Sequence, residues 1–222
     1  MPHCKVKTNS VIIISGGNSY RFQADINHKN YAVRQSIDYE FYLNKNLENP
    51  YFTKCYAILD SFNKGYDYVI WIDDDAFFIN YDWECCFIFK ENKHDIIVTQ
   101  DREKKGKDSN LFNNGIMFLR NTNKTKELFR LIPHITKKEM CKNWKPQWGS
   151  KSNQDQSRMI YLTQAKFDTS LKIVPYPGFN AHEFTFKQKD FLNTKPPIVH
   201  FAGNNKQEKI NRFQNVTGIQ LP

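Results

Sequence analysis

The sequence of 222 residues contains no long hydrophobic run. No apolar stretch approaches the roughly 20 residues that a membrane-spanning helix needs, so no transmembrane segment is predicted. The apolar run near the N-terminus, Val11–Ile14, is also too short for the core of a signal peptide. We therefore expect a cytoplasmic protein without an integral membrane segment.

The sequence also has few cysteines, and they form no recognisable pattern. Their number is five, and no two of them stand in a CxxC pair. Zinc sites and disulfide frameworks use cysteines at short, paired spacings, so neither is predicted, and a reducing compartment is expected. The chain lacks repeats, low-complexity segments and a dividing linker. Its length and its 40% hydrophobic content predict one globular domain over residues 1–222.

Acidic residues are fewer than basic ones, 23 against 32, which gives a formal net charge of +9. A positive charge favours anionic ligands such as phosphates, nucleic acid or an anionic membrane surface. The basic residues are scattered apart from one dense run, Arg102–Lys107, which we interpret as a solvated loop. Neither an amphipathic basic helix nor a nucleic-acid-binding motif is present, so we expect no nucleic-acid partner.

The first third of the chain alternates between strand-like and helix-like segments. Strands are predicted at Val11–Ile14, at Tyr39–Leu43 and in the stretch from Tyr66 to Ile72, with helices at Asn27–Ser36 and Pro50–Asn63. This β-α-β-α-β order is typical of an α/β protein with a parallel sheet and right-handed crossovers.

Further elements are predicted along the rest of the chain. They are a short helix at Tyr81–Lys90, strands at Asp95–Thr99 and Leu111–Leu119, a helix from Asn121 or Thr122 to Leu131, and a helix at Asn153–Leu162. Trp144 and Trp148 flank a proline, and they either stack on a sugar ring or fill the core. We expect the chain after Ile210 to be loosely held.

Three consecutive carboxylates, Asp73–Asp75, follow the third strand and are followed directly by the apolar segment Ala76–Ile79. Acids in such surroundings repel one another and lose hydration, and a divalent cation held by oxygen ligands is the usual counter-charge. Ligands of open α/β sheets bind beyond the carboxyl ends of the strands. We therefore expect a metal and an anionic ligand to meet at Asp73 and Asp75. A plain turn, in which the aspartates bond their own backbone, is the alternative.

Four weaker signals lie elsewhere. Ser15–Asn18 is a Gly-rich turn after a strand, whose backbone N–H groups could bind a phosphate or a base. Gly115 lies in a strand-like segment, where glycine often marks a bulge or the close approach of a ligand. Asp155 and Gln156 lie in the first turns of a helix, near its positive end. His200 follows a short β-branched run, and a lone histidine there is more often structural than a ligand.

Taken together and in order, these segments resemble a GT-A-fold glycosyltransferase. They are most similar to the galactosyl-, xylosyl- and mannosyltransferase family of yeast and plant Golgi membranes. The similar segments are Asn27–Leu43, Phe52–Lys54, Trp71–Ala76, Asn113–Gly115, Asp155–Ser157, Phe179–Ala181 and Val199–Gly203. The last five resemble the family patterns W-[ILM]-D-x-D-A, N-x-G, D-Q, F-N-A and V-H-F-A-G.

The resemblance implies a fold and a set of site residues. The fold would be a Rossmann-like, mixed and mostly parallel sheet flanked by helices, with a nucleotide-binding half over about residues 8–100 and an acceptor-side half over about residues 101–210. Asp73, Asp75 and His200 would hold Mn²⁺, with Mg²⁺ as the alternative. The donor would contact Ser15, Gly16, Gly17, Asn18, Lys54, Asp73, Asp74, Asn114, Gly115 and Lys206. Asp155 and Gln156 would flank the anomeric carbon, as the catalytic pair.

The resemblance leaves the stereochemistry open. In a retaining reaction Asp155 or Gln156 would stabilise an oxocarbenium-like state, whereas in an inverting reaction Asp155 would be the general base for the acceptor hydroxyl. The implied activity is metal-dependent transfer of a hexose, deoxyhexose or pentose from a nucleotide sugar to a glycan, glycoprotein or other hydroxyl acceptor. UDP is the expected carrier, with GDP as the alternative.

The family's members generally carry an N-terminal membrane anchor, which this sequence does not show. A form of this kind would suit a bacterium or a large virus, acting in the host cytoplasm in the viral case. The competing interpretation is a metal-dependent nuclease or nucleotidyltransferase, favoured by Asp73–Asp75 and the positive charge. It would need further carboxylates for a second metal, for which Asp155 is the candidate. A carbohydrate-binding or inactive relative is the third interpretation.

Overall fold

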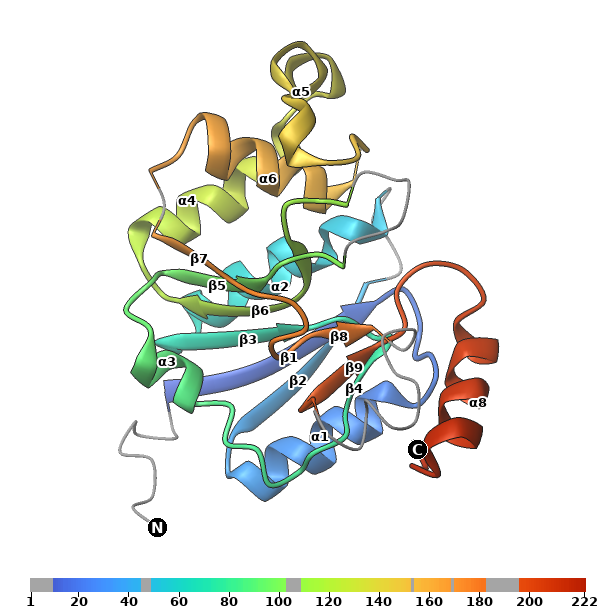
Figure 1. The fold of residues 1–222 in the computed structure, drawn as a ribbon. Coiled ribbons are helices and arrows are strands. Elements are labelled where there is room, and N and C mark those ends of the chain that lie inside the picture. Colours follow the sequence, from blue (N-terminus) through green and yellow to red (C-terminus); the bar gives the residue numbers. More distant parts are fainter. Residues whose placement is uncertain (1–9, 45–48, 103–108, 153, 169, 183–195) are drawn as a thin grey trace.

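The computed structural model describes residues 10–44, 49–102, 109–152, 154–168, 170–182 and 196–222. A six-stranded sheet in the order β2-β1-β3-β6-β5-β7 forms its centre (Figure 1). The strands are β1 (Val11–Gly17), β2 (Asp38–Leu43), β3 (Tyr68–Ile72), β5 (Ile96–Thr99), β6 (Asn113–Arg120) and β7 (Leu171–Val174). β1 pairs in parallel with β2 and β3, and β5 with β7, whereas β6 is antiparallel to both of its neighbours. The predicted mixed, mostly parallel α/β sheet is confirmed.

Helices cover both faces of this sheet (Figure 1). On one face lie α2 (Thr53–Asn63), α4 (Asn123–Leu131) and α6 (Asp155–Ala165), and on the other lie α1 (Ala24–Gln35) and the short α3 (Phe87–Glu91). Alternate residues of a strand point to opposite faces, so Ile12 and Ile14 of β1 enter the first core and Val11 and Ile13 the second. A strand buried on both faces reads as a continuous apolar run, which is why β1 was recognisable in the sequence.

A second, smaller sheet, absent from the predicted elements, lies over the α1 face. Its strands are β4 (Ala76–Phe78), β9 (Ile198–His200) and β8 (Ala181–His182), in that order. Helix α8 (Lys206–Thr217) packs on it through a third apolar cluster that joins Phe77 and Val199 to Phe213 and Leu221. The expectation of a loosely held chain after Ile210 is therefore wrong, because Phe213 and Leu221 are buried.

Trp144 and Trp148 lie at the margin of the first core, beside α5 (Lys137–Asn143) and the short 3₁₀ turns η3 (Ile132–His134) and η4 (Pro146–Trp148). Trp148 is 4% exposed, and its ring meets that of Trp144 edge to face with the centroids 5.5 Å apart. The Trp144 indole N–H donates to the Gly149 carbonyl at 2.9 Å. Of the two predicted uses of these tryptophans, the structure shows the filling of the core.

Several predicted boundaries move. β1 continues through Gly17, so Ser15 and both glycines of the predicted turn lie in the strand, and the turn begins at Asn18. The helix predicted at Tyr81–Lys90 is reduced to α3. Of the two predicted caps of α4 it is Thr122 whose hydroxyl accepts the N–H of Thr125, at 3.2 Å. α6 begins at Asp155.

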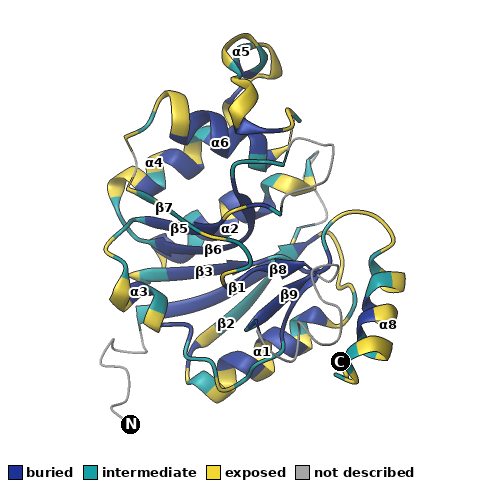
Figure 2. Cartoon of the chain, viewed as in Figure 1, coloured by how far each residue is buried: buried dark blue, intermediate teal, exposed yellow. Residues whose placement is uncertain are grey.

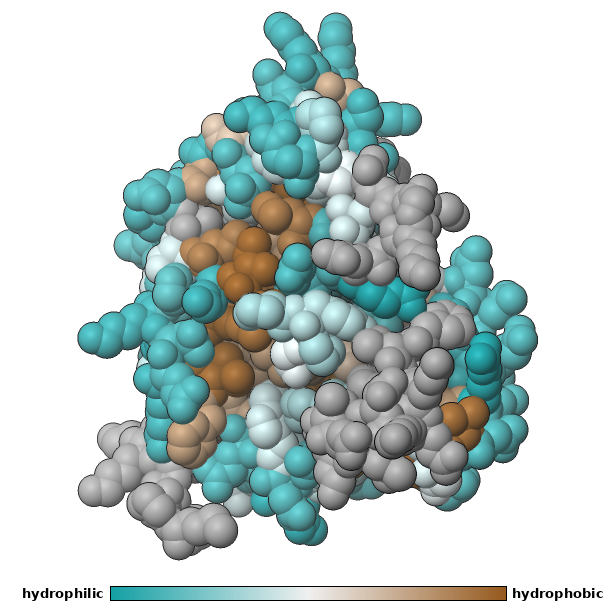
Figure 3. Space-filling view, in the orientation of Figure 1, coloured by the Kyte–Doolittle hydropathy of each residue, from teal (hydrophilic) through white to brown (hydrophobic). Residues whose placement is uncertain are grey.

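The inner strands β1, β3, β6 and β5 are buried almost throughout, the edge strands β2 and β7 are partly exposed, and α5 and the outer face of α8 are largely exposed (Figure 2). Hydrophilic residues cover the top of the molecule over α5, where Lys137, Lys138 and Lys142 face solvent (Figure 3). The predicted basic loop lies outside the described residues except for Arg102. Within the described ranges, no helix combines the length and the apolar character needed to span a bilayer.

Candidate active site

A cavity of about 610 Å³ opens where β1 and β3 end. β6 is antiparallel to β3, so its first residues lie at the same edge, and the N-terminus of α6 joins them. Every predicted site residue except Ser15 contributes to the lining of this cavity. Ser15 points into the interior from β1, and its hydroxyl is buried without a hydrogen-bond partner.

A tight turn follows β3 and carries the three aspartates. The Asp73 N–H donates to the Gly115 carbonyl at 2.8 Å, and the Ala76 N–H donates to the Asp73 carbonyl at 3.0 Å. The chain therefore reverses out of the large sheet into β4 of the small one. In the small sheet β4 pairs with β9, with Ala76 opposite His200. This pairing places His200, which lies far along the chain, beside the aspartate turn.

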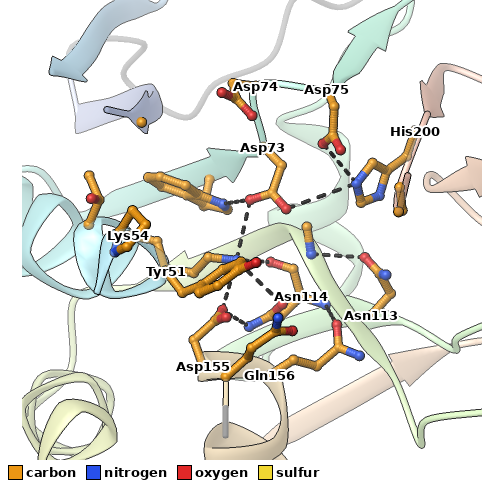
Figure 4. A pocket seen from close by; sticks show the side chains of 18 of the residues that line it. Tyr51, Lys54, Asp73, Asp74, Asp75, Asn113, Asn114, Asp155, Gln156 and His200 are labelled. Atoms are coloured by element: carbon orange, nitrogen blue, oxygen red, sulfur yellow. Dashed lines mark hydrogen bonds and ion pairs between the residues drawn. The ribbon is translucent and has the colours of Figure 1, made fainter. Parts of the chain in front are cut away.

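Asp73, Asp75 and His200 form a compact group of possible metal ligands (Figure 4). One ligand atom from each lies within 4.8 Å of the others. The His200 Nε2 atom is 3.0 Å from Asp75 Oδ1 and 3.9 Å from Asp73 Oδ2. Asp75 and His200 are buried, whereas Asp73 is open to the cavity. A cation could reach the group from that side.

A chain of hydrogen bonds fixes the orientation of the His200 ring. The Gly115 N–H donates to Asn113 Oδ1 at 2.8 Å, and a backbone N–H can only donate. The Asn180 amide nitrogen must then be the group that donates to the same oxygen, at 2.9 Å. The Asn180 oxygen therefore faces His200 and accepts its Nδ1–H at 3.2 Å. The lone pair of neutral His200 is left on Nε2, toward the two aspartates, as a metal ligand requires.

The pKa values in this group show how strongly its members interact. Burial lowers the pKa of His200, but the Asp75 and Asp73 carboxylates more than offset this and raise it above its usual value. Burial raises the pKa of Asp75, yet His200 and Lys206 bring it well below its usual range. The Lys206 ammonium lies 2.5 Å from Asp75 Oδ2. When His200 is neutral, the buried Asp75 Oδ1 atom accepts no hydrogen bond, which leaves a lone-pair site for a cation or for the proton that His200 would bring.

A second polar cluster lies below the aspartate turn in the view of Figure 4. The buried Lys54 ammonium is 2.9 Å from Asp155 Oδ2 and 3.3 Å from Asp73 Oδ1. The Asn114 side chain donates to the same Asp155 oxygen at 2.6 Å, and the Asn114 N–H donates to Gln156 Oε1 at 3.1 Å. The two predicted catalytic residues are thus tied through Lys54 and Asn114 to the predicted metal and donor residues.

The structure adds residues that the motifs did not indicate. Arg21 binds both carboxylate oxygens of Asp74, at 2.7 and 2.9 Å. Burial raises the pKa of Asp74 to about 6, although Arg21 acts in the opposite direction. Asn113 and Asn180 lie inside the N-x-G and F-N-A segments, but their link to His200 depends on tertiary contacts. An arginine just after the Gly-rich turn is the one sequence signal that could have suggested Arg21.

The position of the His200 ring requires a glycine at residue 115. A Cβ atom at this position would lie 2.2 Å from His200 Cε1, which is far too close. The pairing of β5 with β6 also shifts register between Ile97 and Thr99, next to this segment. Both the predicted bulge and the predicted close approach occur here, but the approaching group is a histidine ring of the protein itself.

His28 of α1 forms a hydrogen bond to the residue that follows the aspartate turn, with its Nε2 2.7 Å from the Ala76 carbonyl oxygen. Burial lowers the pKa of His28 from 6.5 to about 4, although the Ala76 hydrogen bond and the Asp75 charge both act to raise it.

At a pH between these two values, the His28 side chain binds a proton in the unfolded chain but not in the folded protein. Lowering the pH from about 7 to about 4.5 should therefore cost about 2–3 kcal/mol of stability through His28. In His28→Gln, whose amide can donate to the same carbonyl without titrating, this part of the loss should vanish.

Urea unfolding of the parent and the variant at both pH values measures this difference. Other groups titrate in both proteins alike, so only the difference between them reports on His28. An equal loss in parent and variant would show that His28 is not held neutral.

Comparison with known proteins shows the family to which the chain belongs. A sequence profile of the nucleotide-diphospho-sugar transferases matches residues 44–213, more than half of the chain. The chain belongs to the nucleotide-diphospho-sugar transferase family. Its reaction class is therefore transfer from a nucleotide diphospho-sugar, and it is an enzyme of the glycosyltransferase kind. No curated protein matches the chain at the sequence level.

Two solved structures share the fold of this transferase. One is a glycosyltransferase involved in the glycosylation of the major capsid of PBCV-1, with a TM-score of 0.66, 14% identity, and coverage of 93% of this chain and 99% of that one. The other is the glycosyltransferase GlyE of Streptococcus pneumoniae TIGR4, with a TM-score of 0.52, 13% identity, and coverage of 89% and 55%. At these identities the likeness shows the fold, which is the GT-A-like arrangement predicted from the sequence.

Proposed function

We propose that this transferase is metal-dependent and moves a hexose, deoxyhexose or pentose from a UDP-sugar to a hydroxyl of a glycan or glycoprotein. The observation that carries the proposal is the convergence of Asp73, Asp75 and His200 at the edge of a polar cavity. Within the family, the order of the D-x-D, N-x-G, D-Q, F-N-A and H-F-A-G segments favours a relationship to the galactosyl-, xylosyl- and mannosyltransferases.

The donor set of this group fits Mn²⁺, with Mg²⁺ as the alternative. Two carboxylates and one imidazole suit Mn²⁺ better than they suit Ca²⁺, because Ca²⁺ is bound by oxygen ligands only. When bound, the metal would neutralise charge that develops on the leaving diphosphate. Asn180 accepts from His200 Nδ1, so Nε2 is the nitrogen that carries the lone pair in the neutral ring, and Lys206 supplies a further positive charge at Asp75.

The protein's own groups then position the donor. Gly16, Gly17 and Asn18 line the cavity at the end of β1, where little side-chain bulk separates the backbone from a nucleotide. Gly16 is already tightly packed, because a Cβ there would lie 2.8 Å from the Tyr42 carbonyl. Lys206 and Lys54 lie on either side of the aspartate turn and offer positive charge to a diphosphate.

Asp155 and Gln156 are proposed to flank the anomeric carbon. One oxygen of Asp155 already accepts from Lys54 and Asn114, which holds the carboxylate in place. This arrangement suits electrostatic stabilisation of an oxocarbenium-like state, the retaining alternative, better than removal of a proton from the acceptor. A product analysis that found inversion at the anomeric carbon would reverse this assignment.

The phosphoryl-transfer alternative receives less support from the cavity. In the described part of the chain, Asp73, Asp75 and His200 make up the one group of at least three His, Cys, Asp or Glu residues that could hold a metal. Asp155, the candidate ligand of a second metal, is paired with Lys54 instead. The cationic residues of the lining are paired as well, Arg21 with Asp74 and Lys206 with Asp75. They do not form a free basic track for a nucleic acid.

Thermal unfolding against nucleoside diphosphates, with and without Mn²⁺, tests the proposal. A ligand that binds only the folded state at 100 times its Kd adds about 2.7 kcal/mol of stability. For a domain of this size that corresponds to a rise in Tm of roughly 5–10 °C. We expect such a rise with UDP and Mn²⁺ together, and little with either alone.

Each other outcome of this assay has its own meaning. A larger shift with GDP would move the donor assignment to GDP-sugars and leave the reaction class unchanged. A shift with DNA or RNA but with no nucleoside diphosphate would favour phosphoryl transfer. Release of free sugar from a UDP-sugar with Mn²⁺ and no acceptor would separate an active enzyme from an inactive carbohydrate-binding relative.

A further inference from the structure

Part of the cavity is left unused by the proposed metal and donor residues. The lining residues without a proposed metal or donor role include Pro50, Tyr51, Asn110, Ser150, Ser152 and Gln154. These residues come from the short 3₁₀ turn η2 (Pro50–Phe52), from the segment before β6 and from the segment before α6. In Figure 4, Tyr51 lies on the same side of Asp73 as Asp155 and Gln156, whereas His200 lies at the opposite end of the site.

This part of the lining carries no charged side chain among the described residues. The charged lining residues are Arg21, Lys54, Asp73, Asp74, Asp75, Asp155 and Lys206, and all of them belong to the metal group or to the ion pairs around it. What remains is an aromatic ring, hydroxyls and amides. Neutral donors and acceptors beside an aromatic face match a sugar ring, which has hydroxyls at its rim and an apolar C–H face.

Tyr51 is held toward the cavity by its neighbours in η2. Asn49 caps the turn, with its Oδ1 accepting the Tyr51 N–H at 3.1 Å. Phe52 faces the other way, and the Arg158 guanidinium carbon lies 4.6 Å from the centre of its ring. Tyr51 is left 50% exposed while it lines the cavity. An aromatic side chain in this position costs little entropy to order against a ligand, since it has only two rotatable angles.

The segments that carry Asn110, Ser150 and Ser152 are held by hydrogen bonds. The Leu111 N–H donates to the Trp148 carbonyl at 3.2 Å, which holds together the two segments that carry Asn110 and Ser150. Ser152 is held to α6 by its hydroxyl, 2.9 Å from that of Ser157, and by its N–H, which donates to the same Ser157 oxygen at 3.0 Å. The site is therefore largely formed before any ligand binds.

We propose that this part of the cavity is the acceptor subsite, that it takes a neutral sugar, and that Tyr51 stacks on the sugar ring. The inference rests on the proposed function, because it places the acceptor next to the donor residues Asp155 and Gln156. Because none of the described residues named for this subsite is charged, we expect neutral sugars to bind better than acidic ones.

Saturation-transfer NMR with simple glycosides tests the subsite. The probes are the methyl glycosides of glucose, galactose, mannose and xylose, with methyl glucuronide as the acidic match of the glucoside. UDP and Mg²⁺ are present throughout, with Mg²⁺ chosen because Mn²⁺ would broaden the signals. We expect at least one neutral glycoside to bind, the glucuronide to bind more weakly than the glucoside, and Tyr51→Ala to weaken binding at least about fivefold.

Two further variants sharpen the result. Tyr51→Phe keeps the ring and should bind within about twofold of the parent. Tyr56→Ala is the matched control, since Tyr56 is 46% exposed on α2 and does not line the cavity. UDP binding, measured separately by thermal shift, should be the same in all of these proteins.

The outcomes that overturn the proposal are distinct. Binding of UDP and metal without binding of any neutral glycoside would remove the subsite. So would glycoside binding that is unchanged in Tyr51→Ala, or a preference for the glucuronide. A parallel loss of UDP binding in Tyr51→Ala would assign Tyr51 to the donor. If neither UDP nor GDP binds the parent protein, the proposed function itself fails, and the subsite fails with it.

Discussion

Asp75→Asn should abolish the stabilisation of the protein by UDP and Mn²⁺, with metal-dependent UDP binding weakened at least about 100-fold. The substitution keeps the shape of the side chain and removes one of the two carboxylates that face His200 Nε2. It also leaves Lys206 without its partner, so positive charge would oppose a cation where it was previously balanced. Mass action then predicts a flat Tm against UDP with Mn²⁺ over the range in which the parent responds.

The control for this experiment is Asp168→Asn. Asp168 is fully exposed, its carboxylate lies 3.7 Å from Lys124, and neither residue lines the cavity. This variant should respond to UDP and Mn²⁺ as the parent does. His200→Ala should repeat the loss seen with Asp75→Asn. A His200→Ala protein that binds UDP and Mn²⁺ like the parent would show that the three-ligand site is wrong.

Lys54→Met should destabilise the folded protein by about 3–5 kcal/mol, because it removes the counter-charge of two carboxylates. Burial alone would lower the pKa of Lys54, but Asp155 and Asp73 raise it above its usual value, so the group is charged in the folded protein. Without it, the Asp155 carboxylate would be buried and left with the neutral Asn114 as a donor. The expected fall in Tm is roughly 10 °C, measured by calorimetry or circular dichroism.

Lys64→Met is a matched control for this loss. Lys64 also pairs with two carboxylates, Glu40 at 2.7 Å and Asp60 at 2.8 Å, but its side chain is 42% exposed. Solvent screens these pairs, so the substitution should cost less than about 1 kcal/mol.

The double variant Lys54→Met with Asp155→Asn identifies the cause of the loss. If the uncompensated carboxylate is responsible, neutralising Asp155 should return part of the lost stability. A double variant less stable than Lys54→Met would point instead to lost packing of the lysine stem, which lies near Trp71. Transfer activity should stay low in either case, because Asp155 is one of the proposed catalytic residues.

Patterns among residues close in the sequence predicted the order of most helices and strands. Val11–Ile14 and the segment up to Ile72 are apolar runs because both faces of their strands are covered. The carboxylates of Asp73–Asp75 were conspicuous because buried acids need a partner. The sequence around His200 favours a structural role for this histidine, and only the resemblance to known glycosyltransferases predicts that it is a metal ligand.

Longer-range relations could not be read from local patterns. The small sheet is formed by strands of two or three residues, too short to show a hydrophobic period. The pairing of Ala76 with His200 in this sheet brings His200 to Asp73 and Asp75. The ends of α3 and α6 were also misplaced, because tertiary contacts decide where a short helix begins.

The sequence by itself determined that this protein has an α/β fold and a carboxylate turn at a strand end, because strand periodicity and buried charge are local properties. Only the tertiary structure shows that Asn113 and Asn180 fix the tautomer of His200, that Arg21 pairs with Asp74, and that Tyr51 lines the same cavity as the aspartate turn. Each of these relations joins residues from separate elements. They exist only after the two sheets have packed, since it is the packing that brings those side chains within hydrogen-bonding distance.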